Sequence, residues 1–180
     1  MPHSERLYYS DSFVTNFAGT VAGARRVDGC GDENLWQLAL SRSAFYPTSG
    51  GQPFDRGVLR VSSPGAATLE IPVEEVMEDD DGTVWHSVRQ PLEAGTQVEG
   101  RIDWDRRFDH MQQHTGQHLV SAIFLRESQA ATVSFHLGES SSTIDLAVTQ
   151  PAQLDLKSGA DLQRGHRRRP SGDDLLCLTR

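Results

Sequence analysis

The sequence predicts a mixed β and α+β fold, in which a small N-terminal β-barrel precedes the beginning of an α/β domain. In the first hundred residues, short apolar segments alternate with turn signals such as Asp81-Gly82, and short strands at this spacing are typical of a barrel or sandwich. After Asp103 the apolar residues change to helical spacing, and no proline occurs as far as Glu127. We therefore expect three parts: a β-barrel with a glycine-rich loop over residues 1–100, a partial α/β domain over 101–150, and a divergent basic tail over 151–180.

The apolar segments of the first part define its expected strands. One of them includes Pro72, which cannot donate a ladder hydrogen bond, so this strand is expected at a sheet edge or interrupted. The acidic cluster Glu78-Asp79-Asp80-Asp81 is interpreted as a solvated hairpin tip instead of a cation site. The expected strands are Leu7–Tyr9, Phe13–Gly23, Leu35–Ser41, Gly57–Val61, Leu69–Met77, Val84–Val88 and Val98–Asp103.

The second part begins with one expected amphipathic helix, from about residue 105 to residue 126. Apolar residues such as Phe108 and Leu119 recur there at roughly helical spacing. Two strands, Ala131–Leu137 and Ser142–Val148, are expected to follow as a hairpin. Residues 151–180 carry six basic and four acidic residues and little apolar periodicity, so we expect poor order there, with either simple solvation or RNA binding as a role.

Composition and charge exclude several classes of protein. With 180 residues, 37% hydrophobic and 23% charged, the chain has the composition of a soluble globular protein. It has no run of 18 apolar residues and a polar N-terminus, so neither a membrane span nor a secretory signal is expected. Cys30 and Cys177 provide no disulfide framework. We expect a cytoplasmic protein, and its net charge of −8 restricts any polynucleotide contact to a local patch.

Three histidines, His110, His114 and His118, follow one another at four-residue spacing in the expected helix. Residues four apart share one face, with Cβ atoms about 5–6 Å apart, and two imidazoles so placed can bind one tetrahedral zinc ion. Histidines on a polar helix face are also often only solvated, so both interpretations stay open. A zinc protease is disfavoured because Thr115 stands where the HExxH motif has its catalytic glutamate.

A second segment, Thr48-Ser49-Gly50-Gly51-Gln52, could bring a ligand close to the main chain. Small residues permit unusual backbone angles and a close approach of the backbone to a ligand. The alternative is a tight connection between two strands. A Walker loop is excluded because no Gly-Lys-Ser/Thr follows.

Four motifs occur in a characteristic order over about residues 5–149. They are Phe45-Tyr46-Pro47-Thr48-Ser49-Gly50-Gly51-Gln52-Pro53-x-Asp55-x-Gly57, Val98-x-Gly100-x-Ile102-Asp103-Trp104-Asp105-Arg106-Arg107, Met111-x-x-His114-Thr115-x-x-His118-Leu119 and Thr143-Ile144-Asp145-Leu146. In these motifs the chain resembles the editing region of alanyl-tRNA synthetases and their freestanding relatives, the alanyl-tRNA editing proteins.

The resemblance implies a β-barrel joined to an α/β editing domain that hydrolyses the ester of tRNA(Ala) mischarged with serine or glycine. It implies zinc as cofactor, bound by His114, His118 and a later Cys-x-x-x-His segment. It also implies the acceptor end of tRNA(Ala) as partner, with neither membrane nor DNA. The substrate-binding residues that it implies are Thr48, Ser49, Gly50, Gly51 and Gln52.

The sequence departs from the family in one respect, because it contains no Cys-x-x-x-His segment. Two of the four expected zinc ligands are therefore missing, so weak zinc affinity and slow deacylation are expected. The chain also ends where the family's α/β domain would continue, as a truncated or frame-shifted product would. The alternative function is accordingly a non-catalytic remnant that binds tRNA or zinc weakly.

Three arginines near the start of the expected helix are candidate contacts for the tRNA acceptor end. They are Arg101, Arg106 and Arg107. The alternative is that they form ion pairs within the chain. The neighbouring carboxylates are those of Asp103, Asp105 and Asp109.

Overall fold

The computed structural model describes residues 4–27, 34–62, 65, 67–138, 141–147 and 175–179. It divides the chain into two compact units, of which unit 1 comprises Met1–Ser49 and Phe54–Arg107, and unit 2 comprises Gly50–Pro53 and Phe108–Arg180. The glycine-rich segment is therefore divided: Thr48 and Ser49 belong to unit 1, and the next four residues belong to unit 2.

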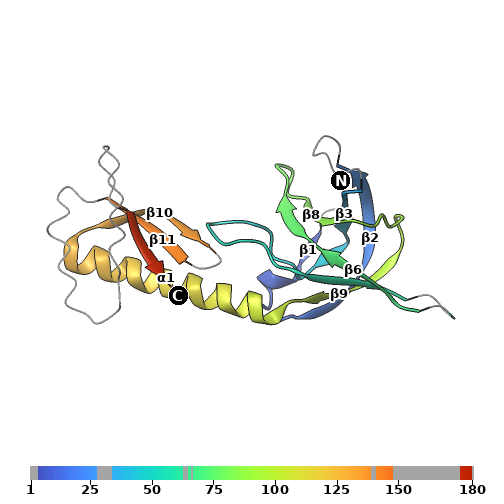
Figure 1. Cartoon of the computed structure of the whole chain (residues 1–180), viewed down its shortest axis with the longest axis horizontal. Coiled ribbons are helices and arrows are strands. Elements are labelled where there is room, and N and C mark those ends of the chain that lie inside the picture. Colours follow the sequence, from blue (N-terminus) through green and yellow to red (C-terminus); the bar gives the residue numbers. More distant parts are fainter. Residues whose placement is uncertain are drawn as a thin grey trace. The chain divides into compact units, whose positions relative to one another are not determined.

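Unit 1 contains a seven-stranded antiparallel sheet that curls into a half-barrel (Figure 1). In spatial order its strands are β6 (Leu69–Val73), β5 (Gly57–Val61), β9 (Gln97–Ile102), β2 (Asn16–Arg26), β3 (Trp36–Leu40), β8 (Val84–Val88) and β7 (Glu75–Glu78). The two edge strands, β6 and β7, are separated in sequence only by Glu74. This single residue brings the opposite edges of the sheet together, which an untwisted flat sheet would not allow.

The region of the two edge strands corrects one prediction about this sheet and confirms another. The expected strand Leu69–Met77 is two strands, β6 and β7, with the break at Glu74. Pro72 lies in β6 at the sheet edge, where its missing N–H costs no ladder hydrogen bond, as expected. The other predicted strands of the sheet agree with the structure apart from their ends.

The N-terminal segment differs from the prediction. The expected strand Leu7–Tyr9 is a 3-10 turn, η1 (Leu7–Tyr9), because the Leu7 carbonyl accepts hydrogen bonds from the N–H groups of Ser10 and Asp11. Just before it, β1 (Glu5–Arg6) pairs in parallel with β4 (Arg42–Ser43). Three residues carry too little periodicity to distinguish a strand from a turn.

The core of unit 1 lies inside the curl of the sheet. Strand β9 shows the period of two that builds it, with Val98, Gly100 and Ile102 buried and the residues between them exposed. Gly100 is required there, since a Cβ atom would lie 2.2 Å from the Phe17 ring. The apolar residues with 0% exposure are Leu38, Leu40, Ala44, Phe45, Leu59, Val76, Val84 and Val88.

Helix α1 (Trp104–Ser128) begins in unit 1 and continues through unit 2. The Asp103 side chain caps it by accepting a hydrogen bond from the Arg106 N–H at 3.2 Å. At the other end Gln129 adopts a φ of 54°, and the Ala130 N–H donates to the Phe124 carbonyl at 3.3 Å. The left-handed residue that ends the helix is thus Gln129 and not a glycine, which explains why no glycine marks the helix end in the sequence.

The buried side of α1 carries polar residues as well as the predicted apolar ones. Arg107, His110, Gln117 and Phe124 are buried and recur every three to seven residues, so they share one side of the helix. Of the apolar residues that defined the predicted face, Phe124 is buried and Val120 packs beside it in the core of unit 2. Phe108 and Leu119, by contrast, are 41% and 64% exposed. The prediction of a helix is confirmed, and its predicted apolar face is confirmed at Phe124 but not at Phe108 and Leu119.

Unit 2 completes its fold with a three-stranded antiparallel sheet, β10 (Ala131–Leu137), β11 (Ser141–Ala147) and β12 (Leu175–Thr179). The sheet packs on the second half of α1 (Figure 1) through Phe124 of the helix and Ile144 and Leu146 of β11. The predicted hairpin is confirmed in β10 and β11, although Glu139 and Ser140 lie outside the described residues.

The tail forms a strand where no order was expected. Leu175–Thr179 pairs with β11, and Cys177 stands opposite Thr143. The expectation of poor order is therefore wrong for these five residues, whereas 151–174 and Arg180 lie outside the described part of the chain, as does Cys30. No helix within the described ranges is long and apolar enough to cross a membrane.

Candidate active site

The two histidines of the HxxxH motif lie side by side on α1. Their ring centroids are 4.9 Å apart and the ring planes differ by 26°, so the imidazoles are stacked. His114 is partly buried, whereas His118 is exposed. The four-residue spacing therefore produces the shared helix face that the sequence predicted.

Gln52 contacts the inner histidine of this pair. The Gln52 side chain is 5% exposed, and its Oε1 lies 3.0 Å from His114 Nδ1. Because an amide oxygen only accepts hydrogen bonds, Nδ1 is the donor and carries the proton. The lone pair of a neutral His114 is therefore on Nε2.

The backbone around Gly51 holds Gln52 in this position. The Gly51 carbonyl accepts a hydrogen bond from the Leu137 N–H of β10 at 2.9 Å. Gly51 has a φ of +79°, and a Cβ atom on it would lie 2.4 Å from the Phe135 carbonyl oxygen. Only glycine fits this approach of loop to strand. The Phe135 ring, 6.4 Å from the His114 ring, completes the surroundings of the histidine.

The surroundings of His114 favour its neutral form. Burial lowers the pKa of His114 below its usual 6.5, and the neighbouring His118 lowers it further. A neutral ring with its proton held on Nδ1 can bind a metal ion or accept a proton through Nε2. The hydrogen bond to Gln52 thus leaves Nε2 of His114 as the nitrogen with a free lone pair.

Zinc binding at this histidine pair stays a prediction, and the pair would supply two of the four ligands of a tetrahedral site. A metal-binding histidine commonly donates its other N–H to an oxygen acceptor, as His114 does to Gln52. In the described part of the chain, no cluster of three or more His, Cys, Asp or Glu side chains could hold a metal. In the register of β11 and β12, Cys177 pairs with Thr143, and Ile144 pairs with Leu176.

The sequence of unit 1 decides the family of the chain. Residues 1–106 match the family described as tRNA synthetases class II (A). The chain belongs to this family. Relatives named alanyl-tRNA editing proteins also match most of the chain, so the resemblance expected from the four motifs is confirmed.

Three relatives illustrate how far the similarity extends. The alanyl-tRNA editing protein Aarsd1-A of Xenopus laevis is 35% identical over 147 residues, which cover 80% of this chain and 33% of the relative. The alanyl-tRNA editing protein AlaX-M of Methanosarcina barkeri is 34% identical over 149 residues, or 81% of this chain and 57% of the relative. The alanine–tRNA ligase of Pyrococcus abyssi is 34% identical over 182 residues, or 100% of this chain and 16% of the ligase.

These matches set the reach of the family assignment. The chain spans about a third of the length of the Aarsd1 relative and 57% of the AlaX-M relative. The motifs had indicated that the resemblance ends at about residue 149. The ligase match covers the whole chain, so in that comparison the resemblance continues beyond this point.

Of the remaining residues of the glycine-rich segment, Thr48 and Ser49 belong to unit 1, whereas Gly50 belongs to unit 2 with the histidine pair. The Thr48 N–H donates to the Val76 carbonyl of unit 1 at 3.2 Å, and Ser49 is exposed in the same unit. Gly50 is exposed in unit 2. The structure thus brings Gly51 and Gln52 to His114, and the roles of Thr48, Ser49 and Gly50 stay predictions.

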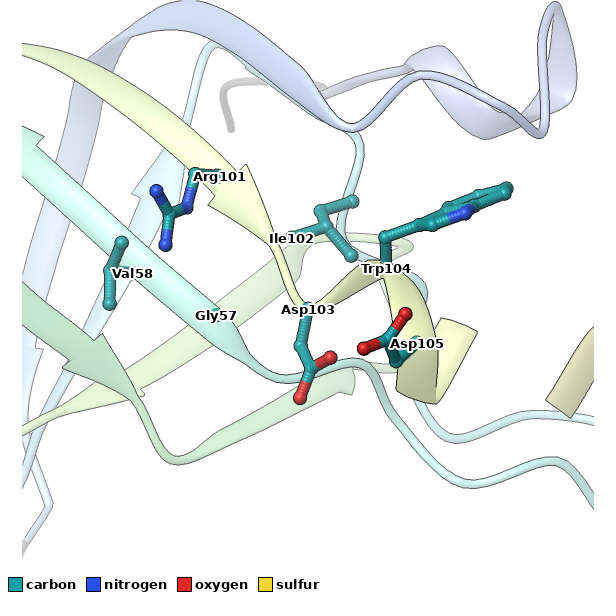
Figure 2. A pocket seen from close by; sticks show the side chains of 7 residues that line it. All are labelled: Gly57, Val58, Arg101, Ile102, Asp103, Trp104 and Asp105. Atoms are coloured by element: carbon teal, nitrogen blue, oxygen red, sulfur yellow. The ribbon is translucent and has the colours of Figure 1, made fainter. Parts of the chain in front are cut away.

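Arg101 and Arg106 occupy two different surroundings near the start of α1. Arg101 is exposed and lines a cavity of about 350 Å³ with Asp103, Trp104 and Asp105 (Figure 2). In Figure 2 the two carboxylates lie beside each other, apart from the Arg101 guanidinium. The cavity lining is acidic on balance, which weakens any attraction for phosphate.

Arg106 Nε donates to the Phe54 carbonyl at 3.2 Å.

Arg107 requires a correction. Its side chain is only 3% exposed and forms an ion pair with Asp55, so it is not available to contact tRNA. Arg107 therefore forms an ion pair within the chain, which was the alternative to tRNA contact. Its partner is Asp55 and not one of the neighbouring residues Asp103, Asp105 and Asp109. Asp55 precedes Arg107 by 52 residues, and no local sequence pattern reveals a pair at that separation. Its place in the same motif as Gln52 was the only signal for Asp55.

Proposed function

We propose that the chain acts in alanyl-tRNA editing, by hydrolysing the ester of tRNA(Ala) mischarged with serine or glycine. The observation that carries the proposal is the Gln52–His114 hydrogen bond, which keeps the His114 proton on Nδ1 and leaves Nε2 as the nitrogen with the free lone pair. The relatives named alanyl-tRNA editing proteins support the same reaction. The acceptor end of tRNA(Ala) is the proposed partner.

His114 and His118 would supply two nitrogen ligands to a zinc ion, which when bound supplies Lewis-acid polarisation of the ester carbonyl. Gln52 keeps the proton of His114 on Nδ1 and so keeps Nε2 available as a donor atom. Gly51 lets the loop approach the Phe135 backbone of β10 closely, and this contact helps to hold Gln52 in place.

The reaction breaks the bond between the aminoacyl carbon and the ribose oxygen. Water supplies the hydroxyl group that joins the acyl carbon, and its proton passes to the ribose oxygen, so that the free amino acid and intact tRNA leave. A site that hydrogen-bonds the serine hydroxyl would discriminate against alanine, because its polar groups would stay unpaired with the methyl side chain.

The test is a deacylation time course with serine-, glycine- and alanine-charged tRNA(Ala), with and without added zinc. We expect release of serine or glycine faster than in buffer and slower than by a complete alanyl-tRNA editing protein, and no release of alanine. The paired variant His114→Asn/His118→Asn should reduce the rate to that of buffer. Serine release by this variant at the wild-type rate would contradict the assignment of the site. Zinc or tRNA binding without any deacylation would support the non-catalytic alternative.

A further inference from the structure

A buried ion pair between Asp55 and Arg107 lies in unit 1, apart from the histidines. The two side chains are 0% and 3% exposed. Arg107 Nε lies 3.0 and 2.9 Å from the two carboxylate oxygens of Asp55, and Nη2 donates to Oδ2 as well. Such a two-pronged pair has a defined geometry that an exposed, flexible ion pair lacks.

The remaining polar atoms of the pair bond three further backbone segments. Arg107 Nη1 donates to the Ser12 carbonyl at 3.0 Å, and Nη2 donates to the Ala44 carbonyl at 2.6 Å. Asp55 accepts the Tyr46 N–H at 2.7 Å. Every charge in the pair is therefore compensated, which is the condition under which burying two charges is tolerated.

The position of the pair in the chain connects it to the candidate site. The chain leaves unit 1 after Ser49, returns at Phe54 and leaves again after Arg107. Gln52 precedes Asp55 by three residues, and His114 follows Arg107 by seven residues, or about two helical turns. Gln52 thus lies in the segment that contains Asp55, and His114 lies in the helix that contains Arg107. The ion pair joins these two segments.

We propose that Asp55 and Arg107 are positioning residues for the site, an inference that rests on the function proposed above. The ion pair fixes the ends of the loop Gly50–Pro53 and the first turn of α1. It therefore reduces the number of conformations that the loop can adopt before Gln52 bonds to His114. A loop with fixed ends loses little further entropy when its side chain binds, and the geometry of a catalytic group controls its rate.

The variant Arg107→Lys tests this, since lysine keeps the charge but not the planar fork. We expect the β-sheet circular dichroism to be retained. The Leu137 amide, which donates to Gly51, should exchange on the order of tenfold faster. In nitrogen NMR spectra His114 should lose its Nδ1-protonated tautomer. The matched control is Arg60→Lys, in the exposed pair with Glu70, and it should change neither signal.

A folded Arg107→Lys protein with the wild-type tautomer and Leu137 exchange rate would overturn the proposal. If that variant does not fold, Asp55→Asn/Arg107→Met removes both charges together and leaves none unpaired. The same loss of the His114 tautomer supports the proposal, and an unchanged tautomer overturns it.

If neither variant folds, hydrogen exchange in the wild-type protein decides. Equal opening free energies for the Arg107 Nε–H and the Leu137 amide support the proposal. Exchange of Leu137 while Arg107 Nε–H stays protected overturns it. Because none of these signals depends on deacylation, an inactive wild-type chain that shows them would contradict only the proposed function.

Discussion

His86 Nε2 lies 2.8 Å from Ser43 Oγ inside the core of unit 1, and both side chains are fully buried. His86 Nδ1 is 3.0 Å from the Leu38 carbonyl oxygen, which only accepts, so Nδ1 carries the proton and Nε2 accepts from Ser43. The Ser43 oxygen in turn accepts from the Phe45 N–H at 3.1 Å. The neutral imidazole is completely satisfied, and the Ser–His pair is structural because no substrate can reach it.

This relationship predicts a pH-dependent stability of unit 1. Burial lowers the pKa of His86 to about 4, against 6.5 in the unfolded chain. Between those values the unfolded state binds the extra proton, so stability is full above pH 6.5 and falls as the pH drops toward 4. The total loss from this one residue is roughly 3 kcal/mol.

The measurement is urea unfolding followed by tryptophan fluorescence between pH 7 and pH 4.5. The variant His86→Asn should be less stable at pH 7 and should show a smaller decline with falling pH than the wild type. Equal pH dependence in the two proteins would show that His86 is not the group responsible.

The glycine-rich loop offers a matched pair of substitutions. Gly50 and Gly51 both have positive φ, at 57° and 79°, but a Cβ atom meets nothing within 4 Å at Gly50 and lies 2.4 Å from the Phe135 oxygen at Gly51. Gly50→Ala should cost about 1–2 kcal/mol from its backbone conformation. Gly51→Ala should cost more and should release the Leu137 amide from its hydrogen bond with Gly51. Similar melting temperatures and similar Leu137 exchange in both variants would contradict the described docking.

Zinc binding provides a separate prediction about the histidine pair. The chain should bind zinc weakly, because His114 and His118 supply only two of the four ligands of a tetrahedral shell. Calorimetry with His114→Ala/His118→Ala should detect no binding, whereas His136→Ala on β10 should bind as the wild type does. Unchanged binding in the double variant would place the zinc elsewhere in the chain.

Removal of residues 151–180 should affect the two units differently. Among the strands that the structure describes, those of the seven-stranded sheet pair only with one another, so the β-sheet circular dichroism of unit 1 should persist. Strand β11 loses its partner β12, so the amides of residues 141–145 that bond it should exchange faster. Aggregation of the whole shortened protein, or unaltered exchange in β11, would contradict this division.

Much of unit 1 could be predicted from the sequence because its strands are short, alternate in polarity and end at turn residues. Gly57–Val61 and Val84–Val88 agree with the structure to the residue. The break at Glu74 could not be predicted, since a continuous apolar alternation looks the same whether a strand turns a corner or continues.

The candidate site was only partly visible in the sequence. Helical spacing correctly brought His114 to His118. The polar stripe from Arg107 to Gln117 has the same spacing as the apolar residues, so periodicity alone could not show which side is buried. The contacts of Gln52 with His114 and of Asp55 with Arg107 join residues more than fifty positions apart, and such contacts are set by topology.

The most direct test of the account is to measure the tautomer of His114 and the deacylation rate together in the wild type and in Gln52→Met. Methionine retains most of the volume of glutamine but cannot accept the Nδ1 proton comparably. The account predicts an Nδ1-protonated His114 in the wild type, its loss in the variant, and a fall of roughly 10–100-fold in the release of serine from tRNA(Ala). A wild-type His114 protonated on Nε2, or a Gln52→Met protein that releases serine at the wild-type rate, would contradict it.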